Sequence, residues 1–268
     1  LRPVMGVTLT KDGNNVSATF DGTSTTTMSI PVNVNVTSVT YNRAFTDGRP
    51  STVMLPFNKA VSEIGGGTFY TFGGVEKKNN KWEATMNEVT GSLTANTPYL
   101  FVPTGTSLTF TGGATLNTTG GGNCLASDTE GWEFHGTYSK KVWNEVETLD
   151  YGFAAASGTS ADGQKDVEAG QFVRLTTGAS PKPMRCYLSY VGSNTPNAGS
   201  NDNLVLTLPK HFKILSVDGQ PYTGNGQDLS KGSTIVFELE AGYKATNVEA
   251  TEDSTTPGEI PDYDDWME

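Results

Sequence analysis

Histidine, cysteine and charged residues are all scarce in this chain of 268 residues. Only 18% of the residues are Asp, Glu, Lys or Arg, and the chain contains two cysteines and two histidines. So few histidines exclude a His-rich metal site, and a Ser-His-Asp triad would have to use His135 or His211. Motifs of the GxSxG, HExxH, phosphate-loop and EF-hand kinds are also missing. The sequence therefore predicts no cofactor and no metal, and it favours a protein that is not an enzyme.

Positive charge is scarcer than negative charge, and long apolar runs are missing. The chain has 18 Lys and Arg against 29 Asp and Glu, which gives a net charge of −11. Because binding to phosphate groups needs clustered cations, we expect no nucleic-acid partner. No apolar run approaches the 18 or more residues of a membrane span, so we expect no direct membrane insertion. Leu1 opens the sequence with neither Met nor a signal-peptide pattern, which suggests a mature or truncated chain.

Glycine and threonine, by contrast, are abundant. The chain has 31 Gly, and about one residue in seven is Thr. Apolar and polar residues alternate over 7–10, 16–20 and 32–36, with Asp-Gly turns between such segments. This pattern is typical of sheets with one solvated face. It predicts an all-β fold, an antiparallel β-sandwich or a partly open barrel, with at most one short helical turn between Asn58 and Ile64.

Changes in composition divide the chain into three parts. Residues 1–191 are expected to form the main antiparallel β domain, and the polar stretch 192–203 is the best candidate for a linker. Residues 204–250 contain several short apolar segments and form either a small C-terminal β module or the last strands of the main domain. Residues 251–268 are acidic and rich in Pro, Ser and Thr, as expected of a solvated tail.

A tryptophan followed by acidic residues provides the one candidate ligand site. Trp143 precedes Glu145 and Glu147, and an aromatic ring beside carboxylates suits a sugar subsite. The alternative is that Trp143 fills the core and the acids form a solvated loop. A glycoside hydrolase is a further alternative, because its two catalytic carboxylates can come from any part of a sequence.

The two cysteines, Cys124 and Cys186, match neither a zinc-ligand spacing nor a redox CxxC motif. A disulfide between them is possible if the chain is exported, and two buried thiols are the alternative.

Several segments in order resemble a β domain of secreted and surface proteins of Bacteroidales, which also occurs in the C-terminal regions of BspA-like proteins. The resemblance covers residues 17–190 approximately. It is carried by residues 41–46 (YNRAFT), 51–57 (STVMLPF), 93–100 (LTANTPYL), 132–138 (WEFHGTY), 151–154 (YGFA), 170–174 (GQFVR) and 183–188 (PMRCYL). It implies an exported, mainly β domain and brings no catalytic residues with it. The leucine-rich repeats of larger members are missing from this sequence.

With this resemblance, we expect an exported, non-enzymatic protein of the cell surface or periplasm that acts in adhesion or surface display. Its expected partners are glycans or surface proteins, and a carbohydrate-binding module is the first alternative. The segment Asp253-Ser254-Thr255 resembles the short O-glycosylation acceptor motif of these bacteria, which makes Ser254 a candidate modification site. Nothing in the sequence indicates an oligomeric state.

Overall fold

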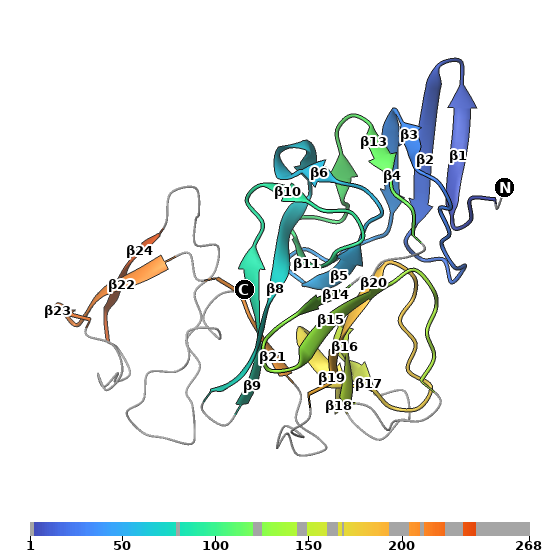
Figure 1. Ribbon diagram of the computed structural model, residues 1–268. Coiled ribbons are helices and arrows are strands. Elements are labelled where there is room, and N and C mark those ends of the chain that lie inside the picture. Colours follow the sequence, from blue (N-terminus) through green and yellow to red (C-terminus); the bar gives the residue numbers. More distant parts are fainter. Residues whose placement is uncertain are drawn as a thin grey trace. The chain divides into compact units, whose positions relative to one another are not determined.

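The computed structural model describes residues 3–78, 81–119, 125–143, 149–159, 166–167, 169–192, 204–209, 212–222 and 233–239. Regular structure in this part of the chain is almost entirely β-strand, and most neighbouring strands are antiparallel (Figure 1). The predicted all-β fold is therefore confirmed, and the described strands form no closed barrel. The chain divides into two compact units, Leu1–Thr207 and Leu208–Glu268.

A ten-stranded sheet dominates the first unit. In spatial order its strands are β14 (Leu125–Ser127), β15 (Trp132–Thr137), β20 (Arg185–Tyr190), β16 (Leu149–Ala154), β19 (Gln171–Arg174), β21 (Leu204–Thr207), β9 (Lys81–Glu88), β8 (Gly67–Lys78), β11 (Pro98–Pro103) and β5 (Ser51–Met54).

Smaller sheets complete the first unit. One has three strands, β1 (Val7–Asp12), β2 (Asn15–Asp21) and β4 (Ser38–Asn42). The others are the pairs β3 (Val34–Val36) with β13 (Ala114–Leu116), β6 (Lys59–Ala60) with β10 (Ser92–Leu93), β7 (Ile64–Gly65) with β12 (Thr109–Phe110), and β17 (Gly158–Thr159) with β18 (Asp166–Val167).

The second unit contains a three-stranded sheet of β22 (Phe212–Val217), β23 (Gln220–Pro221) and β24 (Ile235–Leu239). The sequence leaves open whether residues 204–250 form a small module or the last strands of the main domain. In the structure β21 runs parallel to β9 in the large sheet, and the second unit begins at Leu208. Residues 251–268 lie outside the described part of the chain.

Two strand pairs are parallel, which the sequence pattern did not indicate. β2 pairs with β4, and β21 pairs with β9. A parallel pair needs a long crossover connection rather than a tight turn. Both pairs meet this condition, because β3 lies between β2 and β4, and most of the first unit lies between β9 and β21.

Glycine fixes the hairpin turns where the sequence places Asp-Gly. The β1–β2 ladder closes at Asp12 and Asn15, and Gly13 at the first loop position has φ +56°. Asp218 and Gly219 connect β22 to β23 with φ values of +50° and +77°. Positive φ at both loop positions is the requirement of a type I′ turn, which explains the Asp-Gly sequence there. The expected helical turn is also present, as a single 3-10 turn at Val61–Glu63.

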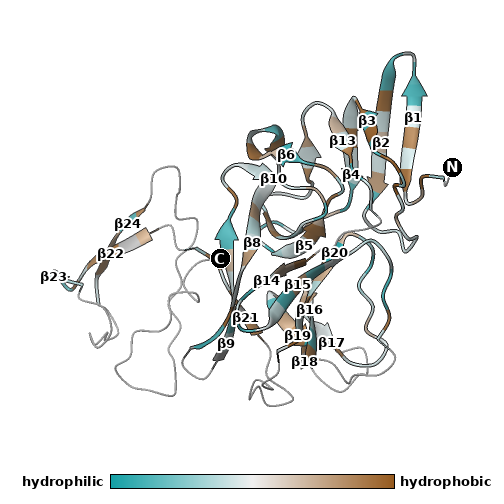
Figure 2. Ribbon diagram, in the orientation of Figure 1, coloured by the Kyte–Doolittle hydropathy of each residue, from teal (hydrophilic) through white to brown (hydrophobic). Residues whose placement is uncertain are grey.

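Alternating side chains bury an aromatic core in the first unit. In β4 the burial pattern alternates strictly, and Val39 and Tyr41 face inward. On β1 and β2 the apolar residues give way to polar ones towards the turn (Figure 2). The largest fully buried side chains include Trp132, Tyr151, Phe101, Phe134 and Phe172. Trp132 is thus part of the core.

No helix in the described residues is long and apolar enough to cross a membrane.

Candidate functional site

The large sheet splits at the end of β16. β16 pairs with β20 from Leu149↔Tyr190 as far as Gly152↔Tyr187, and beyond that point it continues only beside β19. β20 itself continues to Arg185 with β15 on its other side. β16 therefore does not extend along β20 as far as Cys186, and on that side no described strand forms a ladder with this residue.

Thr52 of the edge strand β5 fills this gap. Its Oγ1 accepts a hydrogen bond from the Cys186 N–H at 3.0 Å and donates one to the Cys186 carbonyl at 3.4 Å. The Met54 N–H donates to the Met184 carbonyl at 3.2 Å, next to this contact. β5 and the beginning of β20 are thus joined by the Thr52 side chain, one backbone bond and a weak bond from the Cys186 thiol to the Val53 carbonyl, instead of a ladder. We call this contact the seam.

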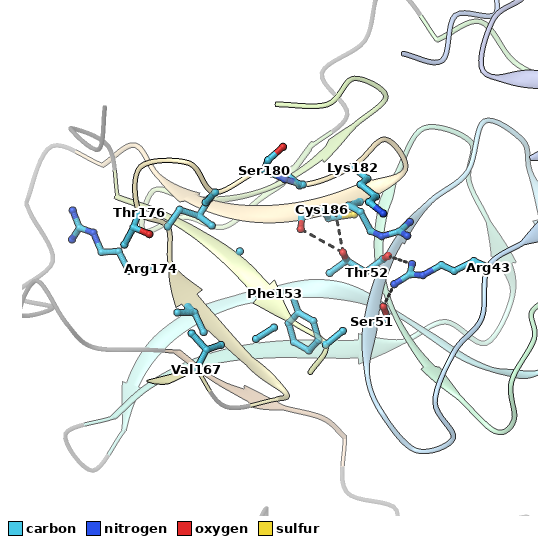
Figure 3. A pocket seen from close by; sticks show the side chains of 18 residues that line it. Arg43, Ser51, Thr52, Phe153, Val167, Arg174, Thr176, Ser180, Lys182 and Cys186 are labelled. Carbon is cyan, nitrogen blue, oxygen red and sulfur yellow. Dashed lines mark hydrogen bonds between the residues drawn. The ribbon is translucent and has the colours of Figure 1, made fainter. Parts of the chain in front are cut away.

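A pocket of about 370 Å³ opens between the seam and the diverging end of β16 (Figure 3). We call it the seam pocket. Its polar lining residues include Arg43, Ser51, Thr52, Arg174, Lys182 and Arg185, and its apolar ones include Phe153, Ala154, Val167, Val173, Leu175 and Pro181. The volume falls in the range of small-molecule sites in proteins.

Arg43 reaches the seam from the loop after β4. It donates through Nη1 to the Thr52 carbonyl at 2.9 Å and through Nη2 to Ser51 Oγ. The guanidinium carbon lies 4.6 Å from the ring centre of Phe45, a cation–π contact. Burial lowers the pKa of Arg43 to about 10, so the side chain remains a cation at neutral pH.

Arg185 lies beside Arg43 and also has neutral partners. It donates to the Tyr41 hydroxyl at 3.2 Å and to the Gly22 carbonyl at 2.6 Å. The charge of Arg185 contributes to the lowered pKa of Arg43, after the larger effect of burial, so the two cations repel each other. Glycine is required at position 22, because a Cβ there would lie 2.8 Å from Arg43 Cβ and 3.1 Å from the Tyr41 ring.

No carboxylate neutralises this pair of arginines among the described residues. The hydrogen-bond partners of Arg43 and Arg185 are carbonyls and hydroxyls, and the described lining of the seam pocket contains no Asp or Glu. Lys182 adds a third, exposed cation at the rim. Hydrogen bonds from Thr23 lower the pKa of the Asp21 carboxyl, and the charge of Lys182 adds a smaller effect in the same direction. Partly buried charges normally have a counter-charge, so this arrangement is suited to an anion.

A strained residue lies between two of these cations. Met184, between Lys182 and Arg185, has φ +62° and is buried, a conformation that a long side chain rarely adopts. Its N–H donates to the Thr137 carbonyl at 2.7 Å, and its carbonyl accepts the seam bond. Such strain persists only where surrounding contacts impose it, and it is commonest at functional sites.

Trp143, the aromatic residue of the sequence-based site, is buried and does not line the seam pocket. Only 4% of it is exposed, and its Nε1 donates to Asp150 Oδ2 at 2.6 Å. Its backbone pairs with Ala179 and Gly178, in the loop that forms one wall of the seam pocket. Tyr187 packs edge-on against the indole at 5.1 Å. Trp143 therefore supports the pocket wall from behind and offers no open face for a sugar ring.

The other residues singled out from the sequence are placed only in part. Glu145, Glu147, Cys124, His211 and Ser254 lie outside the described residues, so the roles expected of them remain predictions.

Cys186 is buried, and its thiol donates a weak hydrogen bond to the Val53 carbonyl at 3.6 Å. His135 stacks on Tyr187 at 5.1 Å and lies 2.8 Å from Glu133, on β15. Nowhere in the described residues do three or more His, Cys, Asp or Glu side chains gather in a way that could hold a metal ion.

Sequence patterns do not reveal the arginines of the seam pocket as site residues, because their segments stand out only through the family resemblance. Five of the segments that carry the resemblance contribute residues to the pocket lining or to the hydrogen bonds of its arginines: 41–46, 51–57, 151–154, 170–174 and 183–188. One signal was available in the sequence. Arg185 interrupts the mainly apolar segment 183–188, and a charge in such a position is seldom accidental.

Comparison of the chain with known protein families, with characterised proteins and with solved structures finds no match.

Proposed function

We propose that this protein is an exported, non-enzymatic binding protein of the cell surface or periplasm. In this proposal it acts in adhesion or surface display, and the seam pocket holds an anionic group of its ligand. The observation that carries the proposal is the pair Arg43 and Arg185, adjacent cations whose described partners are all neutral.

The two guanidinium groups are already positioned for an anion. A guanidinium has five N–H donors, and the hydrogen bonds described above use two on Arg43 and two on Arg185. Each side chain is therefore held in place by neutral partners. Such preorganisation reduces the free energy lost in ordering the site when a ligand binds.

The cationic character is local, which supports a specific site. The chain as a whole carries a net charge of −11, so general attraction of anions to its surface is not expected. Acidic glycans and acidic groups on surface proteins are the partners that suit this combination. Export is proposed on the resemblance of residues 17–190 to surface proteins.

Two alternatives receive less support. A carbohydrate-binding module centred on Trp143 would need an accessible ring, and that ring is buried. A glycoside hydrolase needs two carboxyl groups at a separation of roughly 5–10 Å. The described lining of the seam pocket provides no such pair.

An array of acidic and neutral glycans and peptides tests the proposal. We expect the wild-type protein to bind only anionic members, and Arg185→Gln to reduce that binding by about tenfold or more, as expected for the loss of a charge-assisted hydrogen bond. Arg49→Gln is the matched control, because Arg49 is exposed and does not line the pocket. Failure to bind any anionic member, or equal loss in both variants, would contradict the proposal.

A further inference from the structure

We propose that the ligand group held in the seam pocket is a carboxylate attached to a small apolar body. This inference rests on the proposed function, because it specifies the chemistry of the anion that the pocket receives. It is carried by the different character of the two ends of the pocket.

The cationic end lies at the seam. Arg43, Ser51 and Thr52 lie together on one side of the pocket, Val167 lies away from them, and Phe153 lies between (Figure 3). Arg174 is also a lining residue, but its guanidinium is turned away from Arg43. The cations that can meet one anionic group are therefore Arg43 and Arg185, with Lys182 at the rim.

The other end is an apolar wall. Phe153, Val167 and Leu175 are all partly exposed, so they present apolar surface that a ligand would cover. Phe153 is fixed by an edge-on contact with Phe172 at 5.0 Å. Leu175 lies over Gly152, where a Cβ would come within 2.6 Å of its Cδ2. The wall is thus fixed in shape before any ligand arrives.

The hydrogen-bonding groups of the lining favour an apolar body over a sugar ring. The described lining contains no Asp, Glu, Asn or Gln, and the hydroxyls of Ser51 and Thr52 are already bonded to Arg43 and Cys186. The remaining lining hydroxyls are those of Thr176 and Ser180, and Ser180 Oγ has no hydrogen-bond partner among the described residues. A sugar placed against the apolar wall would leave several hydroxyls unpaired, which is unfavourable. An alkyl or aryl group has no such requirement, and its carboxylate matches the fork of a guanidinium.

A carboxylate on an apolar body can come from a free organic acid or from the apolar C-terminal residue of a polypeptide. Both sources offer the same chemistry to Arg43 and the wall. Titrations of the full chain, followed by NMR, distinguish them with hexanoate and with a tetrapeptide ending in leucine. The tetrapeptide is measured with its carboxylate free and as the amide.

We expect the Kd of hexanoate to be at least about tenfold lower than that of acetate, which lacks the body, or of hexan-1-ol, which lacks the charge. Tighter binding of the tetrapeptide than of hexanoate, lost in the amide, identifies a polypeptide end as the source. Tighter binding of hexanoate than of the tetrapeptide identifies a free organic acid as the source. Either result supports the inference.

Three variants separate the two ends of the pocket. Lys182→Gln and Arg43→Gln are expected to weaken the binding of both hexanoate and acetate. Because Lys182 is exposed, Lys182→Gln is not expected to affect folding. Val167→Thr keeps the shape of the side chain but not its apolar surface, and it should weaken hexanoate about threefold without affecting acetate.

Glucuronate distinguishes failure of this inference from failure of the proposed function. If glucuronate binds more tightly than hexanoate and depends on Arg43, the apolar body is wrong while anion binding stands. If no carboxylate binds at millimolar concentration, both proposals are overturned.

Discussion

Thr52 and Cys186 join two strands that share no ladder. The Thr52 hydroxyl accepts from the Cys186 N–H at 3.0 Å and donates to the Cys186 carbonyl at 3.4 Å. One hydroxyl therefore bonds both the N–H and the carbonyl of Cys186, at the position where β16 no longer runs beside β20. The same residue offers its own carbonyl to Arg43, so closure of the sheet and placement of a cation depend on one position.

Replacement of Thr52 with Val should destabilise the fold. Valine has the same shape but cannot bond the buried N–H and carbonyl of Cys186, and an unsatisfied buried backbone group costs about 1–3 kcal/mol. Thr52→Ser is the control, since it keeps the hydroxyl. The free energy of unfolding, measured in urea, should be lower for Thr52→Val than for Thr52→Ser. Equal stability of the two variants would mean that the seam bonds contribute nothing.

Trp143 should matter for stability. Replacement with Phe retains an aromatic ring but removes the N–H that bonds Asp150 at 2.6 Å in the interior. We expect a loss of about 1–3 kcal/mol, because a buried acceptor loses a hydrogen-bond donor. Val142→Thr, at an exposed neighbouring position, should leave the free energy of unfolding unchanged. Unaltered stability in Trp143→Phe, together with altered glycan binding, would favour the carbohydrate hypothesis.

Gly22→Ala should disturb the arginine pair. The new methyl group would lie within 3.1 Å of both Arg43 and Tyr41, and the backbone at Gly22 also accepts the Arg185 bond. Overpacking of this kind costs about 1–3 kcal/mol. The affinity for anions should fall together with the free energy of unfolding. Gly91→Ala, where nothing lies within 4 Å of the new Cβ, is the control for glycine replacement. Retained affinity in Gly22→Ala would contradict the placement of the site.

The affinity for hexanoate should not vary between pH 6 and 8.5. Burial lowers the pKa of Arg43 to about 10, so its charge persists through this range and is lost only as the pH rises through the lowered pKa. The carboxylate is ionised above about pH 6. Tyr41, Arg185 and Cys186 are the other titratable groups around Arg43, and no histidine is among the described lining residues. A titration step near pH 6.5 would indicate that a histidine controls the site.

Local pattern was enough to predict the strands and their turns. The alternation of apolar and polar residues in Ser38–Asn42 matches its alternating burial, and Asp218-Gly219 forms the tight turn that its sequence suggests. These features depend on neighbours in the sequence, so the sequence alone reveals them.

The site was not predictable in the same way. Arg43 and Arg185 come together only because β16 leaves β20 and β5 takes its place, which depends on the register of strands far apart in the chain. Trp143 illustrates the same limit. Its polar neighbours in sequence suggest an exposed ring, whereas pairing of its backbone with Gly178 and Ala179 draws it into the interior.

In the proposed site, Arg43 and Arg185 together hold the anionic group of a ligand. NMR tests this by following the Nε–Hε resonances of the arginines while hexanoate is added to the protein. We expect the resonances of Arg43 and Arg185 to shift, to saturate and to give the same Kd, while the resonance of Arg49 stays in place. If neither Arg43 nor Arg185 shifts, or if Arg49 shifts equally, the proposed site is wrong.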